Sequence, residues 1–168
     1  MPNRCARPAL LASLVGLALG PTAPVAVGAQ LRVTAMPQLE ARIDGILSPA
    51  GGAMAGLGVN VRAGWYARLG LALSAGAVST AGDVAGTQRL DATARFLFDP
   101  FAEGRRAFYA GAGLGAQRSA SGEVQGFLLG IVGVEGPTEG RVVPSLELTL
   151  GGGARLGVVL RSKRPQGR

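Results

Sequence analysis

The longest regular pattern in the chain is an alternation over residues 57–77, where every odd position is apolar and the even positions are mostly glycine or polar residues. A period of two predicts β-strand, because successive side chains of a strand point to opposite faces. The run is too long for one ordinary strand. We therefore predict a hairpin with its turn at residues 63–65 and with Arg62 facing Tyr66.

The same alternation recurs along the chain and predicts eight strands. We place them near residues 37–45, 54–63, 66–78, 88–98, 107–118, 124–135, 142–150 and 155–161. Their connections are of hairpin length, so neighbouring strands must be antiparallel, and eight such strands can close into a barrel. The sixth strand is apolar on both faces in its middle, which leaves its facing undecided. Pro144 predicts a bulge or a strand end.

The start of the chain has the features of a secretory signal peptide. Arg4 and Arg7 precede an apolar stretch at residues 9–19, and small residues follow at 27–29. This order predicts export and cleavage after Ala29. The expected division is a signal peptide at 1–29, a barrel domain at 30–161 and a basic C-terminal tail at 162–168.

Composition excludes several kinds of chemistry. The chain has no histidine, and its single cysteine, Cys5, lies in the predicted signal peptide. His-based triads, thiol catalysis and zinc–cysteine sites are therefore excluded from the exported part. The net charge of +7 is compatible with nucleic-acid binding, but most arginines stand singly at strand positions of one parity, without the interleaved aromatics of a stacking surface. We predict no enzyme activity, no cofactor, no metal and no nucleic-acid partner.

Alternation alone does not tell which face of the barrel is outside, because membrane barrels and soluble barrels have inverted faces. The polar face consists of glycine with arginine and carboxylates, rather than the Lys, Thr and Gln expected on a water-facing sheet. Glycine and a few ion pairs can fill the narrow lumen of eight strands. We therefore predict an all-β fold, an eight-stranded antiparallel up-and-down transmembrane β-barrel.

Most aromatic residues group at one end of the predicted barrel. With a periplasmic N-terminus, the connections at 63–66 and 99–107 lie on the periplasmic side. Aromatic rings at the level of the lipid headgroups are typical of a membrane girdle. The alternative is that they cap the core of a soluble barrel. The predicted girdle consists of Trp65, Tyr66, Phe96, Phe98, Phe101, Phe108 and Tyr109.

Several stretches resemble small bacterial outer-membrane β-barrel domain proteins. They are Phe-Leu-Phe-Asp-Pro-Phe at 96–101 and the glycine-rich segments at 109–115 and 151–157, among eight alternating strands behind a signal peptide. The resemblance covers nearly all of residues 31–161. It implies localisation in the cell outer membrane, with outer-membrane lipid, the barrel-assembly machinery and periplasmic chaperones as partners. Such barrels usually end in a strand that closes with an aromatic residue, whereas the last strand here holds Leu160.

Charged residues of both signs share the parity of the predicted lumen. A functional interpretation pairs two of the carboxylates as acid and base, as glycosidases do. The structural interpretation is an ion-pair network that fills the lumen, which the excess of arginine favours. We predict the network. A three-residue turn at 151–153 would pair Thr149 with Arg155 and leave Glu147 diagonal to it, so Arg155 is the nearest cross-strand partner predicted for Glu147. Its predicted members are Glu40, Arg42, Arg62, Arg68, Asp91, Arg95, Glu147 and Arg155.

Two classes of function stay open. The first is a monomeric outer-membrane protein with a structural or surface-interaction role and a lumen closed by the charge network. The second is a soluble exported carrier that holds a small apolar ligand in an inverted barrel, as lipocalins do. A pore or a barrel enzyme ranks below both.

Overall fold

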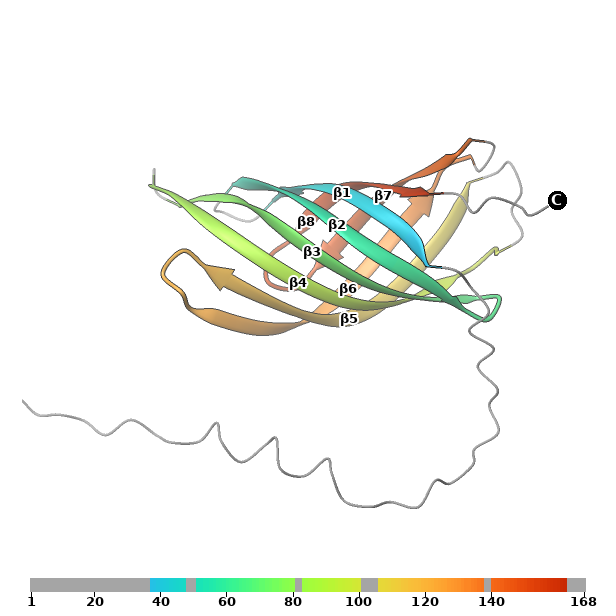
Figure 1. Cartoon of the computed structure of the whole chain (residues 1–168), viewed down its shortest axis with the longest axis horizontal. Helices are drawn as coiled ribbons and strands as arrows, with labels where there is room; N and C mark the ends of the chain where they lie inside the picture. Colours follow the sequence, from blue (N-terminus) through green and yellow to red (C-terminus); the bar gives the residue numbers. More distant parts are fainter. Residues whose placement is uncertain (1–36, 48–50, 81–82, 101–105, 138–139, 163–168) are drawn as a thin grey trace, which may run out of the picture. The chain divides into compact units, whose positions relative to one another are not determined.

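The structure, a computed structural model, describes residues 37–47, 51–80, 83–100, 106–137 and 140–162. All the regular secondary structure in these ranges is β-strand. The strands are β1 (Gln38–Ile46), β2 (Gly52–Ala63), β3 (Ala67–Thr80), β4 (Asp83–Leu97), β5 (Ala107–Ser119), β6 (Val124–Glu135), β7 (Val142–Leu150) and β8 (Arg155–Ser162). Figure 1 shows them side by side in chain order. In these ranges there is no helix long and apolar enough to cross a membrane.

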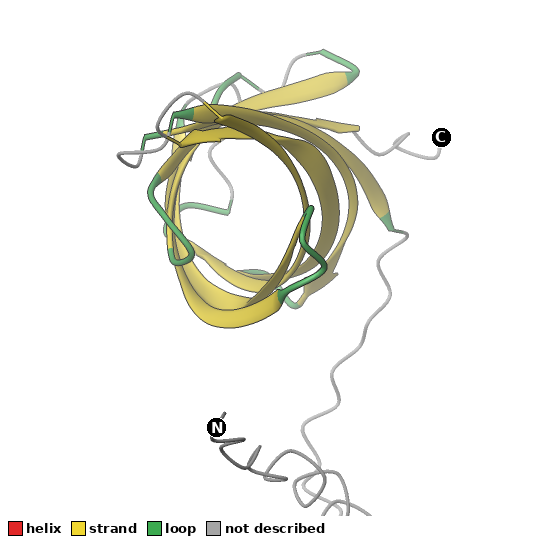
Figure 2. Ribbon diagram, turned by 90° about the vertical axis from the view of Figure 1, so that its left-hand side faces the viewer, coloured by secondary structure: helices red, strands yellow, loops and turns green. Residues whose placement is uncertain are grey.

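The strands form one closed antiparallel ring. Each strand pairs with the next, and β8 pairs with β1 from Glu40–Arg161 to Ile46–Arg155. Figure 2 shows the ring from one end. The predicted eight-stranded antiparallel up-and-down barrel is confirmed. We call the end that holds the β2–β3, β4–β5 and β6–β7 connections the proximal end. The opposite end, with the other four connections, is the distal end.

Side-chain burial alternates along the strands as the sequence pattern predicts. On β4, Thr87, Arg89, Asp91, Thr93 and Arg95 are buried, while the residues between them are exposed. The buried set faces the lumen, because a closed ring leaves only its interior for side chains of one parity. The molecule is thus polar inside and apolar outside.

Glycines on the inward face make room for large side chains from neighbouring strands. A Cβ atom added to Gly157 would lie 2.0 Å from Oδ1 of Asp44, and one added to Gly133 would lie 2.3 Å from the ring of Tyr109. The high glycine content therefore has a packing reason. A narrow ring can hold long charged side chains only where the facing positions carry none.

The β2–β3 hairpin differs from the prediction by one step of register. Arg62 pairs with Arg68 rather than facing Tyr66, so the turn consists of residues 64–66. Gly64 adopts a φ of 83°, a left-handed conformation that glycine accepts without strain. Placing the turn one residue further on puts this glycine at the first turn position and keeps the same residues on each face.

One more expectation changes in detail. Residues 79, 80 and 83–86, which lie between the predicted third and fourth strands, belong to β3 and β4, because the β3–β4 ladder continues out to Thr80 and Asp83. Pro144 is the third residue of β7 and causes no bulge, since the pairing with β8 runs unbroken through it. Its ladder to β6 begins only at the next residue, Ser145, so the proline lies near a strand end, as expected.

The sixth strand takes a definite orientation. Leu129 and Ile131 are buried in the lumen and Leu128 and Val132 are exposed. At the C-terminal end, Ser162 still belongs to β8, and its hydroxyl accepts a hydrogen bond from the backbone N–H of Leu39 at 2.9 Å. The predicted signal peptide and the tail beyond Ser162 lie outside the described residues.

Candidate functional site

Charged side chains from six of the eight strands occupy the lumen. Six arginines and five carboxylates are buried among the described residues. A buried charge is costly unless it is paired and hydrogen-bonded. Each of these groups has a partner of opposite charge within the lumen. They are Glu40, Arg42, Asp44, Arg68, Arg89, Asp91, Arg95, Glu135, Glu147, Arg155 and Arg161.

Glu147 of β7 lies at the centre of this network. Its Oε1 accepts a hydrogen bond from Nη2 of Arg42 on β1 at 3.2 Å, and its Oε2 lies 3.2 Å from Nη2 of Arg95 on β4. The hydroxyl of Tyr109 on β5 donates to Oε2 at 3.0 Å and accepts from Nη2 of Arg161 at 3.2 Å. One carboxylate thereby joins strands on opposite sides of the ring.

Glu40 organises the proximal half of the lumen. Its Oε2 accepts hydrogen bonds from Nδ2 of Asn60 at 2.6 Å and from Arg95 and Arg161 at 3.2 Å each. Closer to the proximal end, Glu135 is held by Arg68 and Arg161 together. The carboxylates here are shared between arginines, so removing one member affects several strands.

The distal half holds a different arrangement. Asp44 binds Arg42 with both oxygens, at 2.8 and 2.9 Å. Asp91 accepts from Nε of Arg89 at 2.8 Å and from Nη2 of Arg155 at 3.0 Å. The Arg89 guanidinium also lies over the ring of Phe127, 4.1 Å from its centroid. Two arginines therefore depend on one aspartate at this end.

Most of the charged residues predicted for the lumen are placed there together, and two details are wrong. Arg62 stands at the end of β2 with its side chain exposed, so it lies outside the buried network. Arg155 pairs with Asp91 rather than with Glu147. Although Thr149 pairs with Arg155 as predicted, the guanidinium extends across the lumen toward β4.

Four buried charges were missing from the predicted set: Asp44, Arg89, Glu135 and Arg161. Three of them share the inward parity of a predicted member on the same strand, which was signal enough to find them. Glu135 is different, because the apolar middle of β6 gave no facing for that strand. Its inward position follows only from the pairing of β6 with its neighbours in the closed barrel.

The aromatic side chains predicted as a girdle divide into two groups. Trp65, Tyr66, Phe96, Phe98 and Phe108 are exposed at the proximal end, where Phe96 stacks on Tyr66 at 5.7 Å and meets Phe98 edge-on at 5.8 Å. Tyr109 is only 2% exposed and lies in the lumen, so its girdle assignment is wrong. It has the opposite parity from Phe108, which places it inside. Phe101 lies outside the described residues.

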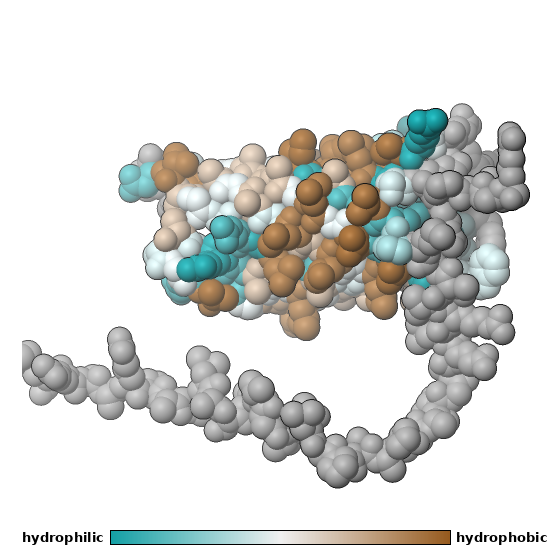
Figure 3. Space-filling view, in the orientation of Figure 1, coloured by the Kyte–Doolittle hydropathy of each residue, from teal (hydrophilic) through white to brown (hydrophobic). Residues whose placement is uncertain are grey.

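The outer surface is apolar along most strands. Figure 3 shows hydrophobic side chains gathered across the middle of one face, with hydrophilic ones toward the ends. These side chains are exposed on the face of the strands opposite to the buried charges. They include Leu57, Leu69, Leu71, Leu73, Leu90, Leu114, Leu128, Val132, Leu146 and Val158.

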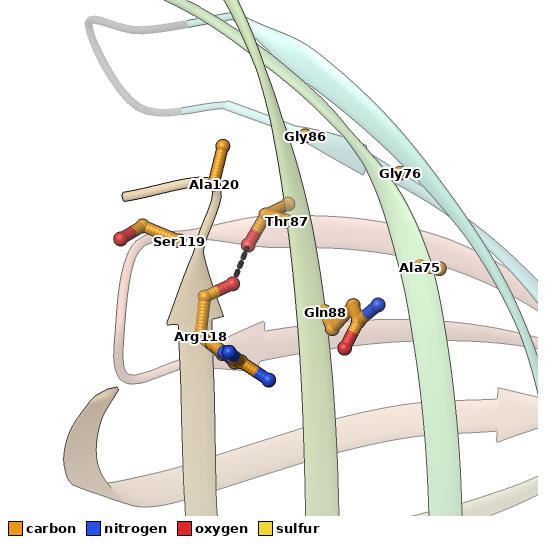
Figure 4. A pocket seen from close by; sticks show the side chains of 8 residues that line it. All are labelled: Ala75, Gly76, Gly86, Thr87, Gln88, Arg118, Ser119 and Ala120. Carbon is orange, nitrogen blue, oxygen red and sulfur yellow. Dashed lines mark hydrogen bonds between the residues drawn. The ribbon is translucent and has the colours of Figure 1, made fainter. Parts of the chain in front are cut away.

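The chemistry available in the lumen is that of ion pairing. Arginine has five N–H donors and no acceptor, so it can satisfy carboxylates but cannot serve as their proton acceptor. No group of three or more potential metal ligands occurs in the part of the chain that is described. A hollow of about 480 Å³ lies between β3, β4 and β5 at the distal end, where the Thr87 hydroxyl donates to the carbonyl of Arg118 at 3.3 Å (Figure 4).

Comparison with known proteins gives one informative result. No protein-family model matches the chain, and no curated protein matches it. Among solved structures, the crystal structure of Neisserial surface protein A is similar, with a TM-score of 0.59 and 17% sequence identity. The match covers 76% of this chain and 96% of the chain of that protein. At this identity the likeness shows a shared barrel fold.

Proposed function

We propose that this protein is a small barrel of the bacterial outer membrane with a structural or surface-interaction role, and that the charge network closes its lumen. The observation that carries the proposal is the inverted distribution of polarity. Leu128 and Leu57 are 76% and 72% exposed on the outside, while charged side chains are buried inside. A soluble monomer rarely exposes such a continuous apolar surface. In a bilayer that surface contacts hydrocarbon.

The backbone arrangement supports the same proposal. A segment in lipid must satisfy its own polar groups, and a closed ring does so through its ladders. The exposed rings of Trp65, Tyr66, Phe96, Phe98 and Phe108 gather at one end, as expected at a headgroup boundary. The fold shared with a Neisserial surface protein agrees with a place at the cell surface.

The lipocalin-like carrier has less support. Such a protein needs an apolar interior for its ligand, whereas the interior described here contains six arginines and five carboxylates. Its outside would also have to be polar to remain in solution. We therefore favour a membrane barrel that does not carry an apolar ligand in its lumen.

A closed lumen argues against a role as a pore or an enzyme. The interior of eight strands is just wide enough for side chains to fill it. Arg42, Arg95 and Arg161 reach Glu147 from three other strands, and together they span the lumen. The proposed role thus depends on the barrel's outer surface and its ends rather than on transport or catalysis.

Cell fractionation followed by electrophoresis tests the membrane assignment. We expect the protein in the outer-membrane fraction, extractable only with detergent, and running at different apparent sizes before and after boiling in SDS. A closed barrel leaves few open edges at which SDS can begin unfolding it. Quantitative recovery from the soluble periplasmic fraction would contradict the proposal and support the carrier.

Planar-bilayer recording tests the closed lumen separately. The purified protein is expected to give no steady conductance, because the charged side chains occupy the interior. A large, stable conductance would show that the lumen is open, even if the protein proves to be a membrane barrel.

A further inference from the structure

The lumen contains a cavity at its distal end that the charge network does not fill. Its volume is about 170 Å³. It is lined by inward-facing residues of β1 to β5 and β8 and by the β7–β8 turn, so it lies on the barrel axis. Among its lining residues are Ile46, Met54, Val78, Arg89, Gln117 and Arg155.

The charge around this cavity is unbalanced. Arg89 and Arg155 both bind Asp91. The next carboxylate, Asp44, uses both of its oxygens for Arg42 and lies 3.8 Å from Nη1 of Arg155. Over the described residues, buried arginines outnumber buried carboxylates by six to five. The surplus positive charge is thus located where two arginines share one aspartate.

Arg155 also has unused hydrogen-bond donors. It is 1% exposed, and its Nε and Nη1 have no hydrogen-bond partner within the described part of the chain. Buried guanidinium N–H groups are normally satisfied, since an unsatisfied one costs free energy. Arg155 lines the cavity, so a negatively charged acceptor bound there would satisfy these donors and also neutralise the surplus charge.

The size and lining of the cavity limit what the acceptor can be. Small-molecule sites are commonly 300–1,000 Å³, so a cavity of about 170 Å³ suits something smaller. The arginines and Gln117 supply polar groups on one side, and Ile46, Met54 and Val78 supply apolar surface on the other. A small oxyanion suits the polar side, and a short apolar part, where the ligand has one, would contact the other side.

We propose that the distal cavity is a binding site for a small oxyanion, either phosphate or a short carboxylate, held by Arg155 and Arg89. Arg155 supplies hydrogen bonds from its unpartnered nitrogens. Arg89 is already bonded to Asp91, to Gln117 and to the carbonyl of Gly151, so it contributes mainly its charge. Because the site lies inside the lumen, this proposal holds whether the barrel is in a membrane or in solution.

Thermal unfolding of the purified, folded protein tests the site. The unfolding midpoint is followed by circular dichroism while inorganic phosphate or butanoate is added at constant ionic strength, made up with sodium chloride. A ligand that binds only the folded state raises the midpoint in a saturable way. A rise with phosphate alone assigns phosphate, and a rise with butanoate alone assigns the carboxylate; a rise with both supports a site for either oxyanion.

Three variants separate this site from a general anion effect. Arg155→Met should abolish the response by removing the donors. Val78→Trp should abolish it by filling the cavity while leaving every charge in place, so it remains informative if Arg155→Met does not fold. Asp91→Asn removes the competing carboxylate and should tighten binding about tenfold. Arg68→Met is the matched control, because it removes an equally buried arginine at the proximal end and should leave the response intact.

The absence of a saturable response in the wild-type protein would overturn the proposal. So would equal responses of the wild-type protein, Arg155→Met and Val78→Trp, because the anion would then act elsewhere or through the solvent.

Discussion

The inner and outer faces of each strand carry side chains of opposite polarity and depend on different interactions. On β4, Leu90 is 46% exposed, while Arg89 and Asp91 on either side of it are each 2% exposed. Inside, a charged side chain depends on partners from other strands. Outside, an apolar side chain depends mainly on the medium that surrounds the barrel. Inner substitutions should therefore affect the whole ring, whereas outer ones should depend on chemistry and on depth along the strand.

The largest effect is expected from Glu147→Ala on the inner face. This change removes the carboxylate shared by Arg42 and Arg95 and leaves buried guanidinium groups without compensation, at a cost of about 3–5 kcal/mol. Denaturant titration of the folded barrel measures the free energy of unfolding. Glu147→Gln is the control, since it keeps the size and an acceptor and should lose less. A loss below about 1 kcal/mol for Glu147→Ala would show that the inner charges act independently.

A slightly smaller effect is expected from Leu71→Arg on the outer face. Leu71 lies between Leu69 and Leu73 on the apolar outer face of β3, with half of its surface exposed, and an arginine at the bilayer midplane costs about 2–4 kcal/mol. Val84→Arg is the control, because Val84 is also exposed but lies at the distal end, where the cost falls to about 0–1 kcal/mol. Equal losses of unfolding free energy for the two variants would mean that the surroundings of the outer face do not change with depth, as they do in a bilayer.

Alanine substitutions at two glycines, one on each face, test how much room each face has for an added methyl group. Gly157→Ala places a Cβ atom 2.0 Å from Oδ1 of Asp44 and should cost about 1–3 kcal/mol by overpacking the lumen. Gly130→Ala on the outer face meets no atom within 4 Å and should be neutral or stabilising by up to about 1 kcal/mol. The measurement is again the free energy of unfolding. Stabilisation by both changes would show that the lumen has unoccupied room at Gly157.

The smallest effect is expected from Phe96→Ala at the proximal rim. It removes the stacking with Tyr66 and the edge contact with Phe98, an aromatic contribution of about 0.5–1.5 kcal/mol. Phe96→Tyr should retain most of it, since the ring remains and its hydroxyl can reach water. A loss as large as that of Glu147→Ala would indicate that the rim, rather than the lumen, holds the ring together.

The strand number, the pairing order and the face of most residues follow from local alternation. The β7–β8 register shows why, since the glycine turn at 151–153 pairs Thr149 with Arg155 in the structure as the pattern predicts. Tyr109 shows that parity is the more reliable guide. Its place near the end of the strand wrongly groups it with the rim aromatics, whereas its parity, opposite to that of Phe108, places it inside.

Partners across the lumen could not be predicted in the same way. Arg155 meets Asp91 of β4 and Glu147 meets Arg42 of β1, and neither pair lies on adjacent strands. Such contacts depend on how the ring closes and on how far each long side chain extends. Which face of β6 turns inward could not be predicted for a related reason. Its apolar middle has no polarity contrast, so the neighbouring strands decide which side of Leu128 and Leu129 turns inward.

The β2–β3 turn carries the chain's single tryptophan, Trp65, exposed at the proximal rim. The protein therefore contains one indole fluorophore, which can be excited selectively over its two tyrosines, and it needs no label. Indole emission shifts to shorter wavelengths when lipid replaces the water around it, whereas far-ultraviolet circular dichroism follows the pairing of all the strands. Recording both signals during refolding into vesicles would reveal whether the proximal rim reaches the bilayer before β1 meets β8.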